Sequence, residues 1–599
     1  MAEGERVKFF NTALQWQLDL GARYHKTKGG VFKIWAPHHD SLLVKIEGKG
    51  AFPLQPTHDG YFGGEISEAE PQDRYFYQFE NGLLRPDPIS RSLPDGVHGA
   101  TMIIDPDSFA WADQAWQLFP LREAIFYELH VGTFSPEGTF AGVIDKISYF
   151  KELGINFIEL MPVAEFPGRW NWGYDGASLY APYHGYGGPN GLKELVNACH
   201  LAGIGVCLDV VYNHPGPEGS YLGEFGPYFS GTYHTPWGKA FNYDGAYSDY
   251  VRDYVIKNAL YWISEYHIDA LRLDAIHSIY DFSASTLISE LSQAIQSFER
   301  EAYVVAESDL NDSKIIRVNE EKGLSALWND DFHHAAHVAL TGEQTTYYND
   351  FNGLQDLAKA MTEGFVYDGK YSSFRKKRHG NRAAGVPFEK FIVFIQNHDQ
   401  IGNRPMGDRL SAIMSHKRLK VGALLCMMTP AIPLLFMGQE YAEKHPFAYF
   451  TDYEDEKLMR AVYEGRKREF HREDMPFPGR DAFQNSKLSW DIKAPDCRDI
   501  FKLYKELISL RQLYPPKPGL KDDGIKVYFS TQNQWIAWEY QTNVNDWIGM
   551  ICHLDSKENL TLPIPFIECQ SKELLLTTEK VEFTKSKITL LPESAVVII

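Results

Sequence analysis

The sequence predicts a multidomain protein in which a (β/α)8 TIM barrel lies between an N-terminal β-sandwich and a C-terminal antiparallel β domain. The chain has 599 residues, which is too many for one compact core. Eight short apolar runs alternate with helical stretches through its middle, and both ends consist of strand-like runs separated by turns. These features together define the predicted architecture.

Residues 1–105 are predicted to form the β-sandwich. The segment "GGVFKIWAPHHDSLLVKIEG" alternates apolar and polar residues and then turns, and "DRYFYQFENGLLRPDP" has an Asn-Gly pair after a strand-like run. The segment from Arg85 to Ala100 is rich in Pro and Gly, and we expect it to be an ordered connector to the barrel.

The barrel is predicted over residues 106–515. Continuous apolar runs are typical of parallel strands that helices cover on both faces. A long gap separates the third run from the fourth, so we predict an insertion around residues 216–245, where the sequence is aromatic and Gly-rich. The eight predicted strands are 124–130, 155–163, 205–214, 268–275, 302–308, 325–332, 391–399 and 432–440.

The last barrel strand lies in an uncharged stretch, Val421 to Gly438, that is almost long enough to span a bilayer. Pro430 and Pro433 interrupt it, so we predict a buried helix, a turn and a buried strand instead. Residues 516–599 return to strand-like runs such as "KVYFS" and "WIAWEY", and we expect them to form the C-terminal β domain.

The charge and the cysteines restrict the partners and the compartment. The formal net charge is −20, from 59 basic and 79 acidic residues, so a nucleic-acid partner is not expected. The first ten residues hold Glu3 and Glu5 and no apolar segment, so we expect neither a secretory signal nor a membrane partner. Six scattered cysteines without a C-x-x-C pair favour the cytoplasm.

Polar residues end the predicted strands, where a barrel of this kind places functional groups. Any one acid there could cap a helix. Asp274, Glu307 and Asp399 together are harder to explain as caps, because buried carboxylates that share a site are costly unless they are used. Glycoside hydrolysis needs two such carboxylates, one to attack the anomeric carbon and one to protonate the leaving oxygen.

Four short motifs give the chain a resemblance to the α-amylase superfamily of glycoside hydrolases. They are "DVVYNH" (209–214), "LRLDAIH" (271–277), "VVAES" (304–308) and "FIQNHD" (394–399), which follow one another on the third, fourth, fifth and seventh predicted strands. The order and the spacing are those of the superfamily. The N-terminal region is similar to the carbohydrate-binding domain that is common in it.

The resemblance implies a role for each catalytic candidate. Asp274 matches the nucleophile, Glu307 the general acid/base, and Asp399 the third acid, which holds sugar hydroxyls. Arg272 matches the residue that keeps Asp274 ionised. The carboxyl groups of Asp274 and Glu307 are then expected to lie about 5–5.5 Å apart, as a retaining enzyme requires.

The resemblance also implies the substrate-binding residues around the cleavage point. His214 and His398 match the pair that hydrogen-bonds the sugar, Tyr174 matches the aromatic on which it stacks, and Asp209 opens the first motif. Asn213 matches a position that helps to bind calcium in many α-amylases. No other part of a calcium site can be identified, so we predict no metal and no cofactor.

Seven longer strings are similar to the narrower family of maltooligosyltrehalose trehalohydrolases: "RPDPISRSLPDGVHGA", "YHTPWGKAFNYD", "DAIHSIYD", "AESDLND", "WNDDFHHAAH", "FIQNHDQIGNR" and "FQNSKLSWD". This implies hydrolysis of the α-1,4 bond next to the terminal trehalose of maltooligosyltrehalose, in the cytoplasm and after a maltooligosyltrehalose synthase. His277 stands where many α-amylases have a Lys followed by His, which favours a specialised acceptor site.

The outer subsites are less sharply defined. Trp172, Trp237 and Tyr180 are candidates for the cleft, although each is equally well explained by packing. His333 and His337 have the spacing of zinc ligands on a helix, but position 334 is His where the zinc-protease motif has Glu. We expect the end of the sixth strand to shape the trehalose subsites instead, through Asp330, Asp331 and Phe332.

Three other functions are compatible with this architecture. An α-1,4-glucan branching enzyme would use the same carboxylates with a sugar hydroxyl as acceptor, and a general α-amylase would cleave without need of trehalose. A non-catalytic glucan-binding scaffold would have no use for the intact set of Asp274, Glu307 and Asp399, which argues against it.

Overall fold

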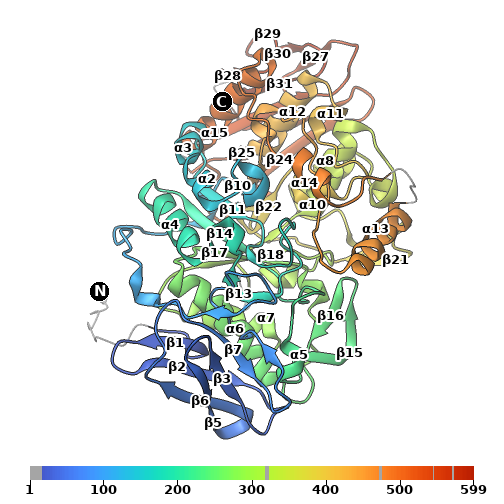
Figure 1. The fold of residues 1–599 in the computed structure, drawn as a ribbon. Helices are drawn as coiled ribbons and strands as arrows, with labels where there is room; N and C mark the ends of the chain where they lie inside the picture. Colours follow the sequence, from blue (N-terminus) through green and yellow to red (C-terminus); the bar gives the residue numbers. More distant parts are fainter. Residues whose placement is uncertain (1–15, 318–322, 471–474, 544–545, 570–572) are drawn as a thin grey trace, which may run out of the picture.

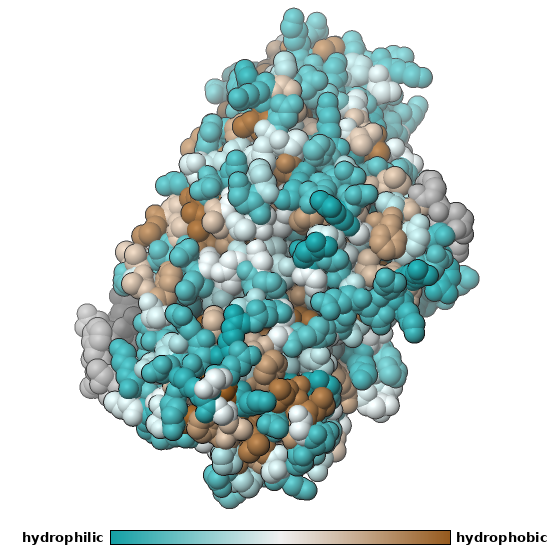
Figure 2. Space-filling view, in the orientation of Figure 1, coloured by the Kyte–Doolittle hydropathy of each residue, from teal (hydrophilic) through white to brown (hydrophobic). Residues whose placement is uncertain are grey.

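The computed structural model describes residues 16–317, 323–470, 475–543, 546–569 and 573–599. Figure 1 shows the barrel between the N-terminal sheets, in blue at one end, and the C-terminal sheets, in red at the other. Most of the face shown in Figure 2 is hydrophilic, with hydrophobic residues gathered in small patches. The described part of the chain contains no helix that is both long enough and apolar enough to cross a membrane.

Eight parallel strands close into the barrel in the order of the sequence. Each predicted apolar run contains one of them, which confirms the predicted barrel. Every residue of the first five except Tyr303 is buried, because helices cover the outside and side chains fill the interior. The strands are β10 Phe126–Leu129, β11 Phe157–Leu160, β14 Gly205–Val210, β17 Ala270–Leu273, β18 Tyr303–Ala306, β19 Ala326–Trp328, β22 Phe391–Val393 and β23 Ile432–Phe436.

Helices on the outside of the barrel connect the strands. They bury one apolar face against the sheet, as in α7, where Leu287, Leu291 and Ile295 recur at a spacing of four residues. The main helices are α3 Ile147–Leu153, α4 Gly188–Leu201, α6 Ser248–Glu265, α7 Leu287–Gln296, α8 Asp330–Thr341, α9 Leu354–Glu363, α12 His416–Met427 and α15 Pro495–Leu513.

Two antiparallel sheets form the N-terminal region, as predicted. Phe32 and Tyr75 pack edge to face between them, with ring centroids 5.2 Å apart. The connector is ordered, and buried Arg91 within it donates to the carbonyl of Ala22 at 2.9 Å. The first sheet holds β1 Gly21–His25, β2 Gly29–Trp35, β6 Tyr61–Ile66 and β5 Gln55–Pro56; the second holds β4 Gly50–Pro53, β3 Leu43–Ile46, β7 Arg74–Gln78, β8 Leu84–Arg85 and β9 Thr101–Met102.

The C-terminal region also consists of antiparallel sheets, as predicted. The exact domain boundaries, predicted near residues 105 and 515, stay predictions. One sheet holds β24 Ile525–Ser530, β25 Trp535–Gln541, β26 Trp547–His553, β31 Ser594–Ile598 and β28 Leu574–Thr577; the other holds β27 Leu560–Pro563, β30 Lys587–Leu590 and β29 Val581–Phe583.

Three loop structures rise from the barrel around the carboxyl ends of its strands. The predicted insertion contains the short helix α5 Leu222–Phe225 and a hairpin of β15 Phe229–Thr235 and β16 Gly238–Phe241. A second hairpin, β20 Asp368–Ser372 and β21 Lys377–Gly380, precedes the seventh strand. Helix α13, Glu456–Phe470, follows the eighth strand. The sequence patterns did not predict the last two.

The uncharged stretch folds as predicted, into α12, a turn and β23. Arg511 of α15 holds this turn in place. Its buried guanidinium donates to the carbonyl of Met427 at 2.9 Å and also to those of Thr429 and Ala431. The first of these carbonyls belongs to the last residue of α12 and the other two to the turn, and all three lie in the core.

Replacing Arg511 with Leu is expected to lower the free energy of unfolding by about 3 kcal/mol, because three buried carbonyls lose their donor. Lys502→Leu on the exposed face of the same helix is the matched control, since the Lys502 side chain is 75% exposed. Denaturant titration of both variants measures the difference. Equal stability of the two would contradict this role of Arg511.

Candidate active site

A cleft of about 670 Å³ opens at the carboxyl ends of the barrel strands. Asp274 directly follows β17, Glu307 directly follows β18, and Asp399 lies in the short helix α10, His398–Gly402, after β22. All three side chains line the cleft. The closure of the barrel therefore brings the three predicted carboxylates from three separate strands to one site.

Arg272 lies directly beneath these carboxylates and is fully buried. Residues 272 and 274 point the same way because side chains alternate along a strand. Its Nη1 is 3.2 Å from Asp274 Oδ1 and also contacts Asp209, and its Nη2 is 3.7 Å from Glu307 Oε2. The guanidinium stacks 4.1 Å from the ring centroid of Trp328. One cation thus contacts three carboxylates.

Glu307 has the properties of a proton donor. Burial raises its pKa well above the ordinary value, Arg272 opposes this rise, and the carboxylates of Asp274, Asp399 and Asp330 reinforce it. The Glu307 Oε2 atom accepts the backbone N–H of Ala275 at 2.6 Å, which fixes the carboxyl group.

Asp274 is oriented by Asn213. The side-chain amide of Asn213 donates to Asp274 Oδ2 and to the Asp274 carbonyl, at 2.9 Å in each case. The amide that the resemblance associates with calcium is therefore turned toward the nucleophile candidate.

The pKa of Asp399 is shifted in the opposite direction to that of Glu307. Burial would raise its pKa, but the neighbouring His398 lowers the pKa to about 2. The His398 ring is itself buried, which would lower its pKa, yet the carboxylates of Asp399 and Glu128 raise that pKa well above the ordinary value. His398 Nε2 lies 3.4 Å from Asp399 Oδ2, and its Nδ1 contacts Glu128. The site therefore holds an imidazolium beside an ionised acid.

Tyr174 forms an aromatic floor beside this pair. Its hydroxyl donates to Asp209 Oδ2 at 2.6 Å and lies 2.7 Å from His398 Nε2, and its ring stacks on His398 with centroids 5.1 Å apart. Asp209 is buried beneath the cleft and lies outside its lining, so it positions Tyr174 and Arg272.

The predicted insertion supplies another wall. Trp237 stands between β15 and β16 with half of its surface exposed, and its ring stacks on that of His214 at 5.5 Å. Both residues line the cleft. A hairpin inserted between the third and fourth barrel strands thus reaches the cleft.

A polar wall lies beside Glu307. His277 accepts the backbone N–H of Asp309 at 3.2 Å, and the Asp309 carboxylate pairs with both terminal nitrogens of Arg375, from the β20–β21 hairpin. Sequence reasoning missed Asp309 and Arg375. Asp309 lies within the segment "AESDLND", which the family resemblance includes. The sequence around residue 375 contains no pattern that predicts a position of Arg375 at the cleft.

The structure places some of the residues predicted for the outer subsites at the cleft and others away from it. Asp330 and Trp172 line the cleft together with His277 and Trp237. Three others lie outside the lining. Asp331 is buried and accepts the N–H groups of residues 366 and 367 at 2.7 Å, Phe332 packs in the core, and the hydroxyl of Tyr180 donates to a buried carbonyl. These three residues therefore have structural contacts, which corrects their assignment to the substrate or the cleft.

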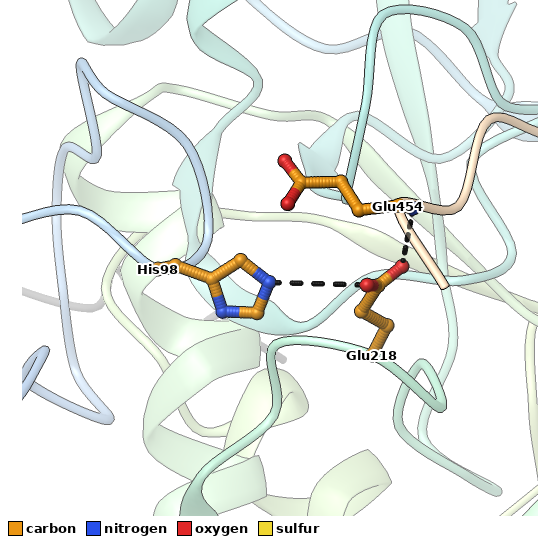
Figure 3. Close-up of side chains that lie close together, drawn as sticks. All are labelled: His98, Glu218 and Glu454. Carbon is orange, nitrogen blue, oxygen red and sulfur yellow. Dashed lines mark hydrogen bonds and ion pairs between the residues drawn. The ribbon is translucent and has the colours of Figure 1, made fainter. Parts of the chain in front are cut away.

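The described residues contain one group of three potential metal ligands, His98, Glu218 and Glu454 (Figure 3). His98 Nε2 is 4.0 Å from Glu218, and Glu218 accepts the backbone N–H of Glu454 at 3.0 Å. His98 and Glu454 are exposed, so this group is a surface contact of three loops. The pair His333 and His337 lies outside it, and His337 pairs with Glu343 at 2.8 Å.

Known proteins resemble the chain in sequence over most of its length. The alpha amylase catalytic domain family matches residues 103–228. A malto-oligosyltrehalose trehalohydrolase from Saccharolobus solfataricus is 46% identical over 488 residues, which cover 81% of this chain and 86% of that protein. One from Rhizobium sp. (strain M-11) is 39% identical over 530 residues, which cover 85% and 89%. A 1,4-alpha-glucan branching enzyme from Pseudoalteromonas atlantica is more distant, at 24% identity.

The fold is similar to solved structures as well. A Salmonella typhimurium protein, provisionally titled an alpha amylase, superposes with a TM-score of 0.90 at 36% identity, covering 97% of this chain and 99% of that one. A pullulanase from Anoxybacillus sp. LM18-11 has a TM-score of 0.71 at 20% identity and covers 97% and 87%, which is a likeness of fold alone.

Asp330→Asn is expected to move the alkaline limb of the pH profile of kcat/KM down by about half a pH unit. Burial raises the pKa of Asp330 to about 7, so above that pH its charge helps to keep the pKa of Glu307 high. Removing the charge favours ionised Glu307, which loses its proton at lower pH. Glu301→Gln, an exposed acid outside the cleft, is the control. An unchanged limb, or one at higher pH, would contradict this coupling.

Proposed function

The chain belongs to the malto-oligosyltrehalose trehalohydrolase family of α-amylase-type glycoside hydrolases, and from this premise we propose how its residues share the reaction. The protein is a glycoside hydrolase that cleaves the α-1,4 bond next to the terminal trehalose of maltooligosyltrehalose. The products are trehalose and a maltooligosaccharide. The observation that carries the mechanism is the contact of one buried cation, Arg272, with both Asp274 and Glu307.

The reaction proceeds by double displacement. Asp274 attacks the anomeric carbon while Glu307 protonates the leaving oxygen of trehalose. Glu307, now ionised, then removes a proton from water, which releases the maltooligosaccharide with its α configuration retained. Arg272 pairs with Asp274 at 3.2 Å and orients it, and Asp399 with His398 holds hydroxyls of the reacting ring. The predicted separation of about 5–5.5 Å between the Asp274 and Glu307 carboxyl groups belongs to this proposal.

The trehalose subsites lie on the side of Glu307, because this residue must reach the leaving oxygen. The polar wall of His277, Asp309 and Arg375 lies on that side, and Asp330 lines the cleft as well. Trehalose is rich in hydroxyl groups, and charged side chains held in fixed pairs can donate to and accept from such groups. Trp237 adds an exposed aromatic face for a sugar ring.

A branching reaction would use the same three carboxylates, so the acceptor decides between the two functions. The branching enzyme resembles the chain at 24% identity, well below the trehalohydrolases. Iodine staining of amylose over time distinguishes them, since branching changes the colour without release of trehalose.

We place the enzyme in the cytoplasm, after a synthase that builds the trehalose end. Buried thiols support an environment without disulfide formation. They are Cys199, Cys207, Cys426, Cys497 and Cys552.

Incubation with maltotriosyltrehalose is expected to release trehalose and maltotriose, and maltopentaose should be cleaved at least about tenfold more slowly. Chromatography identifies the sugars. Glu307→Gln should reduce turnover on the order of 10³-fold while binding is kept, because the proton donor is lost. Equal cleavage of the two substrates would make the protein a general α-amylase, and new branch points without hydrolysis would support the branching enzyme.

A further inference from the structure

One wall of the cleft has no part in the mechanism above. It is formed by the loop after β23 and by helix α13, which we call the α13 wall, and its residues are Tyr449, Tyr453, Leu458, Val462 and Arg466. The last three recur every four residues, so they share one face of the helix. That face is half-buried toward the cleft, whereas Lys457, Arg460 and Glu464 on other faces are exposed.

The α13 wall is continuous with the residues that hold the reacting sugar. Trp172 packs edge to face on Tyr174 at 6.5 Å, on His398 at 5.8 Å and on Tyr449 at 5.1 Å. The guanidinium of Arg466 then lies 4.4 Å from the ring centroid of Tyr449. A chain of ring contacts thus leads from the cleavage subsite to α13.

The polar wall beside Glu307 belongs to a different network. It runs through His277, Asp309 and Arg375 and does not include Trp172 or Tyr449. Because the leaving group lies beside the proton donor, the sugar units on the other side of the cleaved bond must extend past Tyr174. The α13 wall is what they meet there.

The chemistry of the α13 wall suits a neutral glucan chain. Its aromatic and aliphatic side chains can cover the apolar C–H faces of glucose rings, and Arg466, which donates to the carbonyl of Gly402 at 3.0 Å, closes its far end. From Leu458 to Arg466 the helix rises about 12 Å, enough for more than one glucose unit. The trehalose side, by contrast, is lined by paired charges.

The α13 wall is also held in a fixed position. The carboxylate of Asp455 caps α13 by accepting the N–H of Lys457 at 2.8 Å. Glu218, from the loop after β14, accepts the N–H groups of Glu454 at 3.0 Å and Asp455 at 3.2 Å. His98 of the N-terminal connector approaches Glu218 from the other side (Figure 3). Such anchoring lowers the entropic cost of binding a chain.

We propose that the α13 wall binds the maltooligosyl chain beyond the cleavage subsite and thereby sets the preference for substrate length. This inference rests on the proposed function and deepens it. Leu458, Val462 and Tyr453 are the specificity-determining residues, and they act on the part of the substrate that leaves as the maltooligosaccharide.

The test compares two substrates, glucosyltrehalose and maltopentaosyltrehalose, in the double variant Leu458→Asn with Val462→Asn. We expect kcat/KM for the long substrate to fall about tenfold, because two apolar contacts with the chain are lost, and kcat/KM for the short one to change less than about twofold. Arg460→Asn, the same replacement on the exposed face of α13, should change neither. Thermal melting of the variants establishes that the helix is intact.

Binding provides a second measurement. Calorimetry in a Glu307→Gln background should show weaker binding of maltopentaose in the double variant and unchanged binding of trehalose. Equal loss on both substrates, or no loss on the long one, would overturn the inference. Failure of the wild-type protein to release trehalose from either substrate would instead refute the proposed function, so the two failures can be told apart.

Discussion

The burial of one guanidinium constrains the whole mouth of the barrel. Arg272 has no exposed surface and lies among Asp209, Asp274 and Glu307. Three carboxylates at this spacing would repel one another in a medium of low dielectric, and a cation among them offsets that repulsion. Burial raises the pKa of Glu307 well above its ordinary value and that of Asp209 to about 7, and the charge of Arg272 opposes both rises.

Two buried acids, Glu128 and Glu159, lie in the barrel interior below Arg272. The parallel register pairs Glu128 with Glu159 on neighbouring strands. Neither oxygen of Glu159 has a hydrogen-bond partner among the described residues, and burial, with Glu128 next to it, raises its pKa well above the ordinary value. Glu159 therefore favours its neutral form, while Glu128 contacts the His398 ring and accepts the backbone N–H of His398 at 3.1 Å.

The barrel could be predicted because its strands are continuous apolar runs with polar ends, and the residues that follow those ends, such as Asp274 and Glu307, were found for the same reason. Residues 330 to 332 show the limit of this reasoning. They begin helix α8, where each step turns the side chain by about 100°, so Asp330 faces the cleft while Asp331 and Phe332 face the core. Arg375 lies on a loop, and helix α13 is carried by the loop after β23; the position of a loop in space leaves no periodic pattern in the sequence.

The N-terminal sandwich and the insertion are interlocked. Arg85 forms two hydrogen bonds with Glu224 of α5, at 2.8 and 3.0 Å, and Trp35 of β2 packs on Tyr228 and stacks on Tyr250. The same insertion carries Trp237 to the reacting centre. In evolution the two segments would thus be inherited as one module, because a recombination that exchanged the sandwich alone would remove the contacts that hold the base of the hairpin and would thereby alter the cleft that Trp237 lines.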